Sequence, residues 1–255
     1  MSCPVLKNNL LIGWDVGGWN CDSNPNSRDA LCAIEEKERT PAVVGNWWRG
    51  NLRATLVKHK GIDLISSMLE LVNVDFKEYS HVTFAIDTPL AWPNAMIELV
   101  TNGTTQMVPG NPDNNPYLFR AQERALFSTG CRPLSTVRDM IGSQSTKGIY
   151  FLNQAGLKNK SVGVWENEES SISVIETYPA VAVRNAKIKN LTMHLFAGLK
   201  QKSSKKGWAA ACKTDVSDAI TCALVGRYHR VYRGQLNLPP MGTQCDEGWI
   251  WLPSV

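Results

Sequence analysis

The sequence places carboxylates at the ends of two apolar runs, where a metal ion or a substrate can reach them. Asp15 closes an apolar run that begins at Leu10, and Gly17 and Gly18 follow it. Glycine lets the backbone turn sharply and leaves room for a metal ion or a phosphate. Asp87 directly follows the run 82–86, and a charge there is costly in a core unless it is paired or bound to a metal ion. A simple turn is the alternative explanation for each aspartate.

Glu176 is a third displayed carboxylate, in the segment 172–179. The period-two alternation of a strand places Ile172, Val174 and Glu176 on one face. An apolar face that ends in a carboxylate is how an open α/β sheet presents a site beyond its strand ends. Contact with a metal ion and an ion pair with a nearby Arg or Lys are both compatible with this position.

Asp215 and Asp218 form a pair in a segment of helical character. They are three residues apart, so both side chains lie on one side of a helix. Ala219, Cys222 and Ala223 flank them with small side chains, which allow the helix to approach a sheet closely. A negative charge at Asp215 would also suit the start of the helix, but that account leaves Asp218 unexplained.

Carboxylates drawn from several strands and one helix suit the hydrolysis of a phosphodiester bond. The reaction needs an activated water and a stabilised leaving oxyanion on opposite sides of phosphorus, and two Mg²⁺ or Mn²⁺ ions about 3.5–4 Å apart supply both. These hard cations require oxygen ligands. The seven Cys and four His form no CxxC pair or zinc-like cluster, and there is no GxSxG motif. We therefore expect a metal-dependent nuclease whose catalytic residues are Asp15, Asp87, Glu176, Asp215 and Asp218.

Composition and charge agree with a globular protein that binds a polyanion. Of the 255 residues, 43% are hydrophobic and 20% are charged. No apolar run reaches the roughly 18 residues of a membrane span, and the N-terminal segment lacks the features of a signal peptide. We therefore expect a cytoplasmic protein with no membrane partner. Residues 184–233 hold eleven Lys or Arg against two Asp, and such a basic stretch beside an acidic metal site would attract the phosphates of nucleic acid.

Apolar periodicity predicts one α/β domain over residues 1–255, with a helical insertion at about 93–160. Strands are expected at 10–16, 30–35, 40–44, 81–87, 161–165 and 171–177. Helices are expected within 53–71, near 117–127 and 136–155, from Pro179, and over about 214–232. The stretch 92–116 is rich in Pro, Asn and Gly and is expected to be mostly loop.

The order of these motifs resembles that of proteins with the ribonuclease H-like fold. The motifs are Gly13-Trp-Asp-Val-Gly-Gly18, Phe84-Ala-Ile-Asp-Thr-Pro-Leu90, Glu176-Thr-Tyr-Pro-Ala180 and Asp215-Val-Ser-Asp-Ala-Ile-Thr-Cys-Ala223. The last two look like those of RuvC-type Holliday-junction resolvases. The whole order, together with the segments 115–120, 123–124 and 142–145, is similar to the family of unknown function number 429, described as predicted nucleases of this fold.

This resemblance covers about residues 8–18, 82–155 and 172–226, and it implies a mixed β-sheet flanked by α-helices. The metal ligands that it implies are Asp15, Asp87, Asp215 and Asp218. The basic side chains that would contact phosphate, including two from the run 200–206, are Arg120, Arg124, Lys147, Lys205 and Lys206. The likeness to resolvases also suggests a homodimer.

Two other functions are compatible with the same residues. A non-catalytic nucleic-acid-binding or assembly protein would keep the fold and bind without using the acids, because a fold does not fix a function. An ATP-binding phosphotransferase of the actin and sugar-kinase superfamily shares this core and an early Asp-x-Gly-Gly. Such proteins need a duplicated second domain and further Gly-rich phosphate loops, for which 255 residues look too few.

Overall fold

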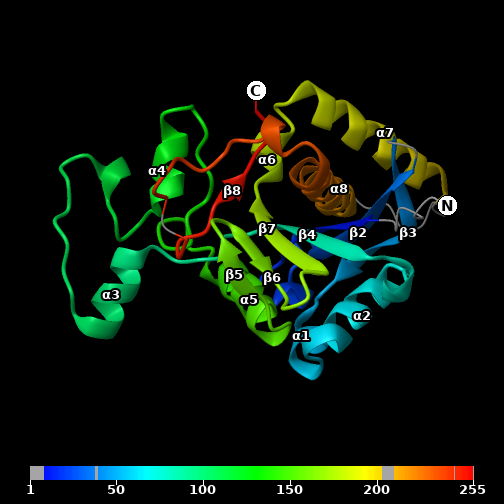
Figure 1. Ribbon diagram of the computed structural model, residues 1–255, viewed down its shortest axis with the longest axis horizontal. Coiled ribbons are helices and arrows are strands. Elements are labelled where there is room, and N and C mark those ends of the chain that lie inside the picture. The colour runs from blue at the N-terminus through cyan, green and yellow to red at the C-terminus, as the bar shows by residue number, and fades with distance from the viewer. Residues whose placement is uncertain (1–8, 38–39, 203–209, 244, 255) are drawn as a thin grey trace, which may run out of the picture.

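A mixed β-sheet runs through the computed structural model, which describes residues 9–37, 40–202, 210–243 and 245–254 (Figure 1). Eight strands form this sheet in the described part of the chain. They are β1 (Asn9–Asp15), β2 (Asp29–Lys37), β3 (Thr40–Gly50), β4 (His81–Asp87), β5 (Lys158–Ser161), β6 (Val164–Glu166), β7 (Ile172–Thr177) and β8 (Ile250–Trp251). Their order is β3-β2-β1-β4-β7-β6-β5, and β8 pairs with β7. The expected α/β class with a mixed open sheet is confirmed.

The centre of the sheet is parallel and its flanks are antiparallel. β4 pairs in parallel with β1 and β7, and β8 pairs in parallel with β7. β1, β2 and β3 form an antiparallel meander on one side, and β5 and β6 extend the sheet on the other. Because parallel strands end at the same edge, the carboxyl ends of β1, β4 and β7 lie together, where an open α/β sheet presents its site.

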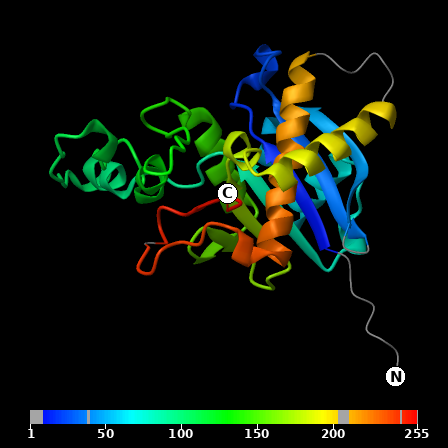
Figure 2. The ribbon, with the colours of Figure 1, turned by 90° about the horizontal axis from the view of Figure 1, so that it is seen from above.

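Helices cover both faces of the sheet (Figures 1 and 2). They are α1 (Arg53–Lys58), α2 (Gly61–Leu71), α3 (Asn94–Asn102), α4 (Ala121–Phe127), α5 (Gly142–Gln154), α6 (Pro179–Ala182), α7 (Ala186–Lys202) and α8 (Ala210–Val231). Short 3₁₀ turns lie at Cys21–Ser23, Phe76–Glu78, Pro112–Asn114 and Arg233–Gln235. One core cluster joins α1, α2 and α5 to the sheet, and a second joins α7 and α8 to its other face. No helix among the described residues combines the length and the apolarity that crossing a membrane would take.

The segment 94–139 extends to one side of the sheet (Figure 2). It carries α3 and α4, whereas α5 packs on the sheet through the buried side chains of Phe151 and Leu152. The stretch 92–116 is mostly irregular, as predicted, but it also contains the helix α3. That helix ends at Gly103, whose φ of 66° gives the left-handed C-terminal cap that glycine favours.

His229 makes the α8 side of the core sensitive to acid. Its ring lies 4.6 Å from that of Trp251 between centroids, and its Nε2 has no hydrogen-bond partner among the described residues. Burial, with smaller contributions from Arg233, Arg230 and His81, lowers the pKa of His229 to about 3. An unfolded His titrates near pH 6.5, so the stabilising effect of the neutral ring is complete above that pH and is lost as the pH falls toward 3.

We expect the His229→Phe variant to keep the ring contact and to lose this acid sensitivity. Between pH 7 and pH 5 the wild type should lose about 2 kcal/mol more free energy of unfolding than the variant. Urea unfolding of both proteins at the two pH values measures the difference. Equal losses in the two proteins would show that His229 is not the titrating group.

Candidate metal-binding site

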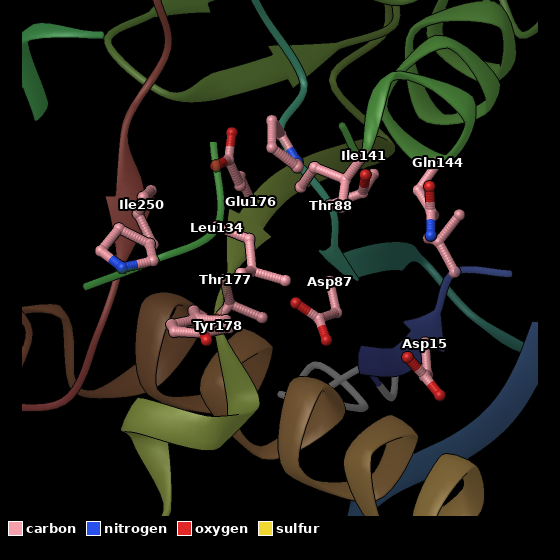
Figure 3. A pocket seen from close by; sticks show the side chains of 13 residues that line it. Asp15, Asp87, Thr88, Leu134, Ile141, Gln144, Glu176, Thr177, Tyr178 and Ile250 are labelled. Carbon is pink, nitrogen blue, oxygen red and sulfur yellow. The ribbon is translucent and has the colours of Figure 1, made fainter. Parts of the chain in front are cut away.

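Two aspartates lie side by side at the carboxyl ends of β1 and β4. Asp15 and Asp87 are register partners in the parallel pairing of these strands, and neighbouring strands lie about 4.8 Å apart. Both residues are half-buried. Figure 3 shows their carboxylates near the turns of α8, pointing in different directions. The structure therefore brings together two acids that are remote along the chain.

Helix α8 brings the second pair of aspartates to the same edge, because it touches the backbone of β1. A Cβ atom on Gly13 would lie 1.7 Å from the carbonyl oxygen of Ala219 and 2.6 Å from the amide nitrogen of Ala223. The expected close approach of the helix through small residues is confirmed, since Ala219, Cys222 and Ala223 are all fully buried against the sheet. Asp218 directly precedes this contact, so it lies near the end of β1.

Mutual repulsion among these acids appears in their pKa values. Burial first, and then the charges of Asp87, Asp218 and Asp215, raise the pKa of Asp15 well above its ordinary value. Burial, followed by the charge of Asp218 and then that of Glu176, does the same to the pKa of Asp87. Burial and Asp215 raise the pKa of Asp218 to about 6. A divalent cation would relieve this repulsion and restore the charged carboxylates.

The side chains are not arranged as a closed metal cage. Among the described residues, no group of three or more His, Cys, Asp or Glu side chains converges closely enough to hold an ion. The donors at the edge are all carboxylate oxygens, which is the ligand type that Mg²⁺ and Mn²⁺ prefer. Ion binding at this edge therefore requires the side chains of Asp15, Asp87 and Asp218 to turn toward a common point.

Asp215 differs from the other three aspartates because it is already paired. Arg49 Nε donates to Asp215 Oδ2 at 2.6 Å, and the Arg28 backbone N–H donates to the same oxygen at 3.3 Å. Arg49 lies on β3 opposite Ala30, which is itself the register partner of Asp15. One carboxylate oxygen of Asp215 is thus engaged, and metal ligation through it would have to displace Arg49.

The structure corrects the assignment of Glu176, which lies on the opposite face of the sheet. Glu176 is aligned with Ile86 of β4, which is aligned with Trp14 of β1, so these three side chains share one face of the sheet. Asp15 and Asp87 each follow by one residue along their strands, and their side chains therefore lie on the other face. Glu176 is buried and makes a bidentate pair with Arg120, with Nη2–Oε1 at 2.5 Å and Nη1–Oε2 at 2.8 Å. The ion pair is therefore the explanation that the structure supports, and its partner is remote in sequence.

Arg120 is likewise not placed to contact phosphate. Its side chain is fully buried, and its Nε donates to Glu123 Oε1 at 2.8 Å while the other two nitrogens reach Glu176. Arg120 Nη1 also donates to the carbonyl of Glu247 at 3.2 Å. Each of its nitrogens has a partner inside the protein, so Arg120 joins the extended segment to β7 and to the C-terminal region.

Lys147 is a second predicted phosphate contact that the structure contradicts. Its side chain is fully buried on α5, and its Nζ contacts the carboxylate of Asp29. The same nitrogen donates to the carbonyls of Gly17 and Gly18, each at 3.2 Å, and to Asn51 Oδ1 at 3.1 Å. Lys147 therefore fixes the turn that follows Asp15.

Of the remaining predicted phosphate contacts, one lies in the described part of the chain and two do not. Arg124 is half-buried on α4, in the extended segment. Lys205 and Lys206 lie outside the described residues.

A pocket of about 120 Å³ opens beside the acidic edge of the sheet (Figure 3). Asp15, Asp87 and Glu176 are among its lining residues. The rest of the wall comes from the carboxyl end of β7, from the segment 133–144 and from β8. The acids therefore adjoin a space that a small group of a substrate can enter.

Glu176→Gln tests whether Glu176 is structural. We expect this variant to lose about 3 kcal/mol of free energy of unfolding, because a buried Arg120 loses one of its charged partners. Stabilisation by added Mn²⁺ should persist, since the carboxylate of Glu176 is already held by Arg120 and by the backbone N–H of Leu90. Urea unfolding with and without Mn²⁺ measures both quantities.

Asp113→Asn is the control, because it breaks an exposed pair with Arg132 and should change stability little. Loss of the Mn²⁺ effect in Glu176→Gln would instead place Glu176 among the metal ligands.

No known protein family, no curated protein and no solved structure matches the chain. A function for this site therefore rests on the geometry and the charges of its residues.

Proposed function

We propose that the protein is a metal-dependent nuclease that hydrolyses phosphodiester bonds of nucleic acid with Mg²⁺ or Mn²⁺. One contrast between the faces of the sheet carries this proposal. On the α5 face, the buried acids Asp29 and Glu176 each have a basic partner. On the α8 face, Asp15, Asp87 and Asp218 have no ion-pair partner among the described residues. Half-buried carboxylates without a cation are costly, and a bound metal ion would remove that cost.

The carboxylate oxygens of these residues are suitable ligands for a divalent metal ion. Asp15 and Asp87 would hold a metal ion between two strand ends, and Asp218 would approach it from α8. When bound, divalent ions supply an activated water and stabilise the leaving oxygen. Asp215 would become a further ligand of the metal ion after Arg49 releases its carboxylate. Arg49 is then a cation beside the acids, free to pair with a phosphate of the substrate.

The resemblance to ribonuclease H-like proteins stays a prediction, and the architecture supports it. The resemblance implies a mixed sheet with helices on both faces, and the observed sheet has that form. It also implies acids at strand ends and on a late helix. Asp15 and Asp87 lie at the ends of β1 and β4, and α8 is the late helix that carries Asp215 and Asp218.

A non-catalytic nucleic-acid-binding protein of the same fold is the second candidate. The observation that favours it is the 2.6 Å pair between Arg49 and Asp215, because a fixed cation in the acidic site can substitute for a metal ion. In that protein, binding of nucleic acid would not depend on a divalent metal ion, and no cleavage would follow.

A cleavage screen tests the proposed function. End-labelled single- and double-stranded DNA and RNA are incubated with the full chain and Mg²⁺ or Mn²⁺, and EDTA is added to a parallel set. We expect cleavage of at least one substrate class with metal and none with EDTA. We also expect Mn²⁺ alone to raise the unfolding temperature, because a ligand of the folded state stabilises it. Intact substrates in every condition would refute the nuclease, and absence of the Mn²⁺ effect would refute the metal site.

A further inference from the structure

The pocket beside the aspartates has walls that suit a flat apolar group. The Tyr178 ring lies at one side of it (Figure 3), and Pro89 and Pro133 are also among its lining residues. Leu134 and Ile141 complete the apolar lining from the segment before α5. Leu134 is 48% exposed although it lines the pocket, so its side chain is available to a ligand.

The polar lining of the pocket includes the carboxylates of Asp15, Asp87 and Glu176 and the uncharged side chains of Thr88 and Gln144. Thr88 is 4% exposed, and its Oγ1 is buried without a hydrogen-bond partner among the described residues. This oxygen has almost no accessible surface, so it does not offer a hydrogen bond to a ligand in the pocket. Gln144, half-buried in the same lining, adds an amide that can both donate and accept.

These features together select one class of ligand. A planar group with apolar faces and a polar edge would stack on Tyr178 and hydrogen-bond to the amide of Gln144, which is the way proteins hold an unstacked nucleobase. Asp15 and Asp87 in the same lining would then face the sugar-phosphate attached to that base.

We propose that this pocket binds one unstacked nucleobase of the substrate and thereby places the adjoining phosphate at Asp15 and Asp87. The proposal rests on the proposed function for the identity of the substrate as nucleic acid. It adds that the bound nucleotide is unpaired, because a base inside a duplex cannot enter a pocket. Single-stranded or unpaired segments are therefore the substrate class.

Calorimetric titration tests the pocket with nucleoside 5′-monophosphates, and ribose 5-phosphate serves as the ligand without a base. In the presence of Mg²⁺ we expect at least one nucleotide to bind about tenfold or more tightly than ribose 5-phosphate, as stacking of one base on an aromatic side chain allows. Equal binding of all nucleotides and ribose 5-phosphate to the wild type would overturn the proposal, and this comparison needs no variant.

Two variants locate the binding. Leu134→Trp, which fills the pocket mouth, and Tyr178→Ala, which removes the aromatic wall, should each abolish the tenfold preference. Leu99→Trp, on the exposed side of α3, is the matched control and should keep it. A preference that survives in both pocket variants would refute this location.

The binding and cleavage experiments together distinguish failure of the pocket proposal from failure of the proposed nuclease activity. Base-dependent binding without cleavage supports the pocket and refutes the proposed function. Metal-dependent cleavage without base-dependent binding would support the proposed function and refute the pocket.

Discussion

Asp15→Asn is expected to reduce metal-dependent cleavage by a factor of about 1000 or more, while the metal-free variant becomes more stable than the wild type. The factor corresponds to about 4 kcal/mol of lost transition-state stabilisation, which is reasonable for a ligand of a catalytic ion. The gain in stability follows because Asn removes one charge from a group of aspartates that repel one another. Initial rates of cleavage and urea unfolding without metal measure the two effects.

The control for this prediction is Asp63→Asn, an exposed acid on α2 across the sheet from the site. It should change neither cleavage nor the stabilisation by Mn²⁺. If Asp15→Asn cleaved at the wild-type rate, Asp15 would not be a ligand, and the activity would belong to another site. A variant that instead lost both activity and stability would show that Asp15 supports the fold rather than the chemistry.

The position of Asp15 and Asp87 was predictable because each one ends a strongly apolar strand. Apolar runs fix where a strand ends, and parallel strands bring those ends to one edge. The error at Glu176 has the same origin. Alternation shows which residues share a face within one strand, but only the register between strands relates that face to a neighbour. Glu176 aligns with Ile86 and not with Asp87, and a shift of one position reverses its side.

Long-range ion pairs were beyond local sequence patterns. The pairs of Arg120 with Glu176, of Lys147 with Asp29 and of Arg49 with Asp215 join residues 56, 118 and 166 positions apart. No periodicity encodes such pairing, so basic residues near the motifs were natural candidates for phosphate contact. One signal was present, because Lys147 lies four residues before Phe151 and so shares the helix face that packs on the sheet. A buried Lys needs an acidic partner.

Element boundaries were missed where glycine or a polar run interrupts a pattern. β3 was expected to end at residue 44, but it continues to Gly50 past Gly45, whose φ is 61°. The sheet register shifts in this region, so the strand resumes after an irregularity and carries Arg49 to the site. The helix expected from residue 136 begins only at Gly142, after Met140 adopts a φ of 56°.

Gly13→Ala is expected to destabilise the protein by about 3 kcal/mol or more, because the packing of α8 on β1 leaves no space for a methyl group. The new Cβ would lie 1.7 Å from the backbone oxygen of Ala219, and neither a buried strand nor a buried helix backbone can move cheaply. The helix must shift away from the sheet, which also moves Asp218 away from Asp15. We therefore expect loss of Mn²⁺ stabilisation together with the loss of stability, measured by urea unfolding with and without Mn²⁺.

Gly226→Ala is the matched control, because it adds the same methyl group to the same interface from the helix side. Its Cβ would lie 3.4 Å from that of Ala85, which is ordinary van der Waals contact. Alanine also favours a helix over glycine by about 1 kcal/mol, so this variant should be as stable as the wild type or more so. Equal destabilisation by the two substitutions would mean that added volume alone is responsible. A well-folded Gly13→Ala protein with unchanged Mn²⁺ binding would show that α8 does not position the aspartates through this contact.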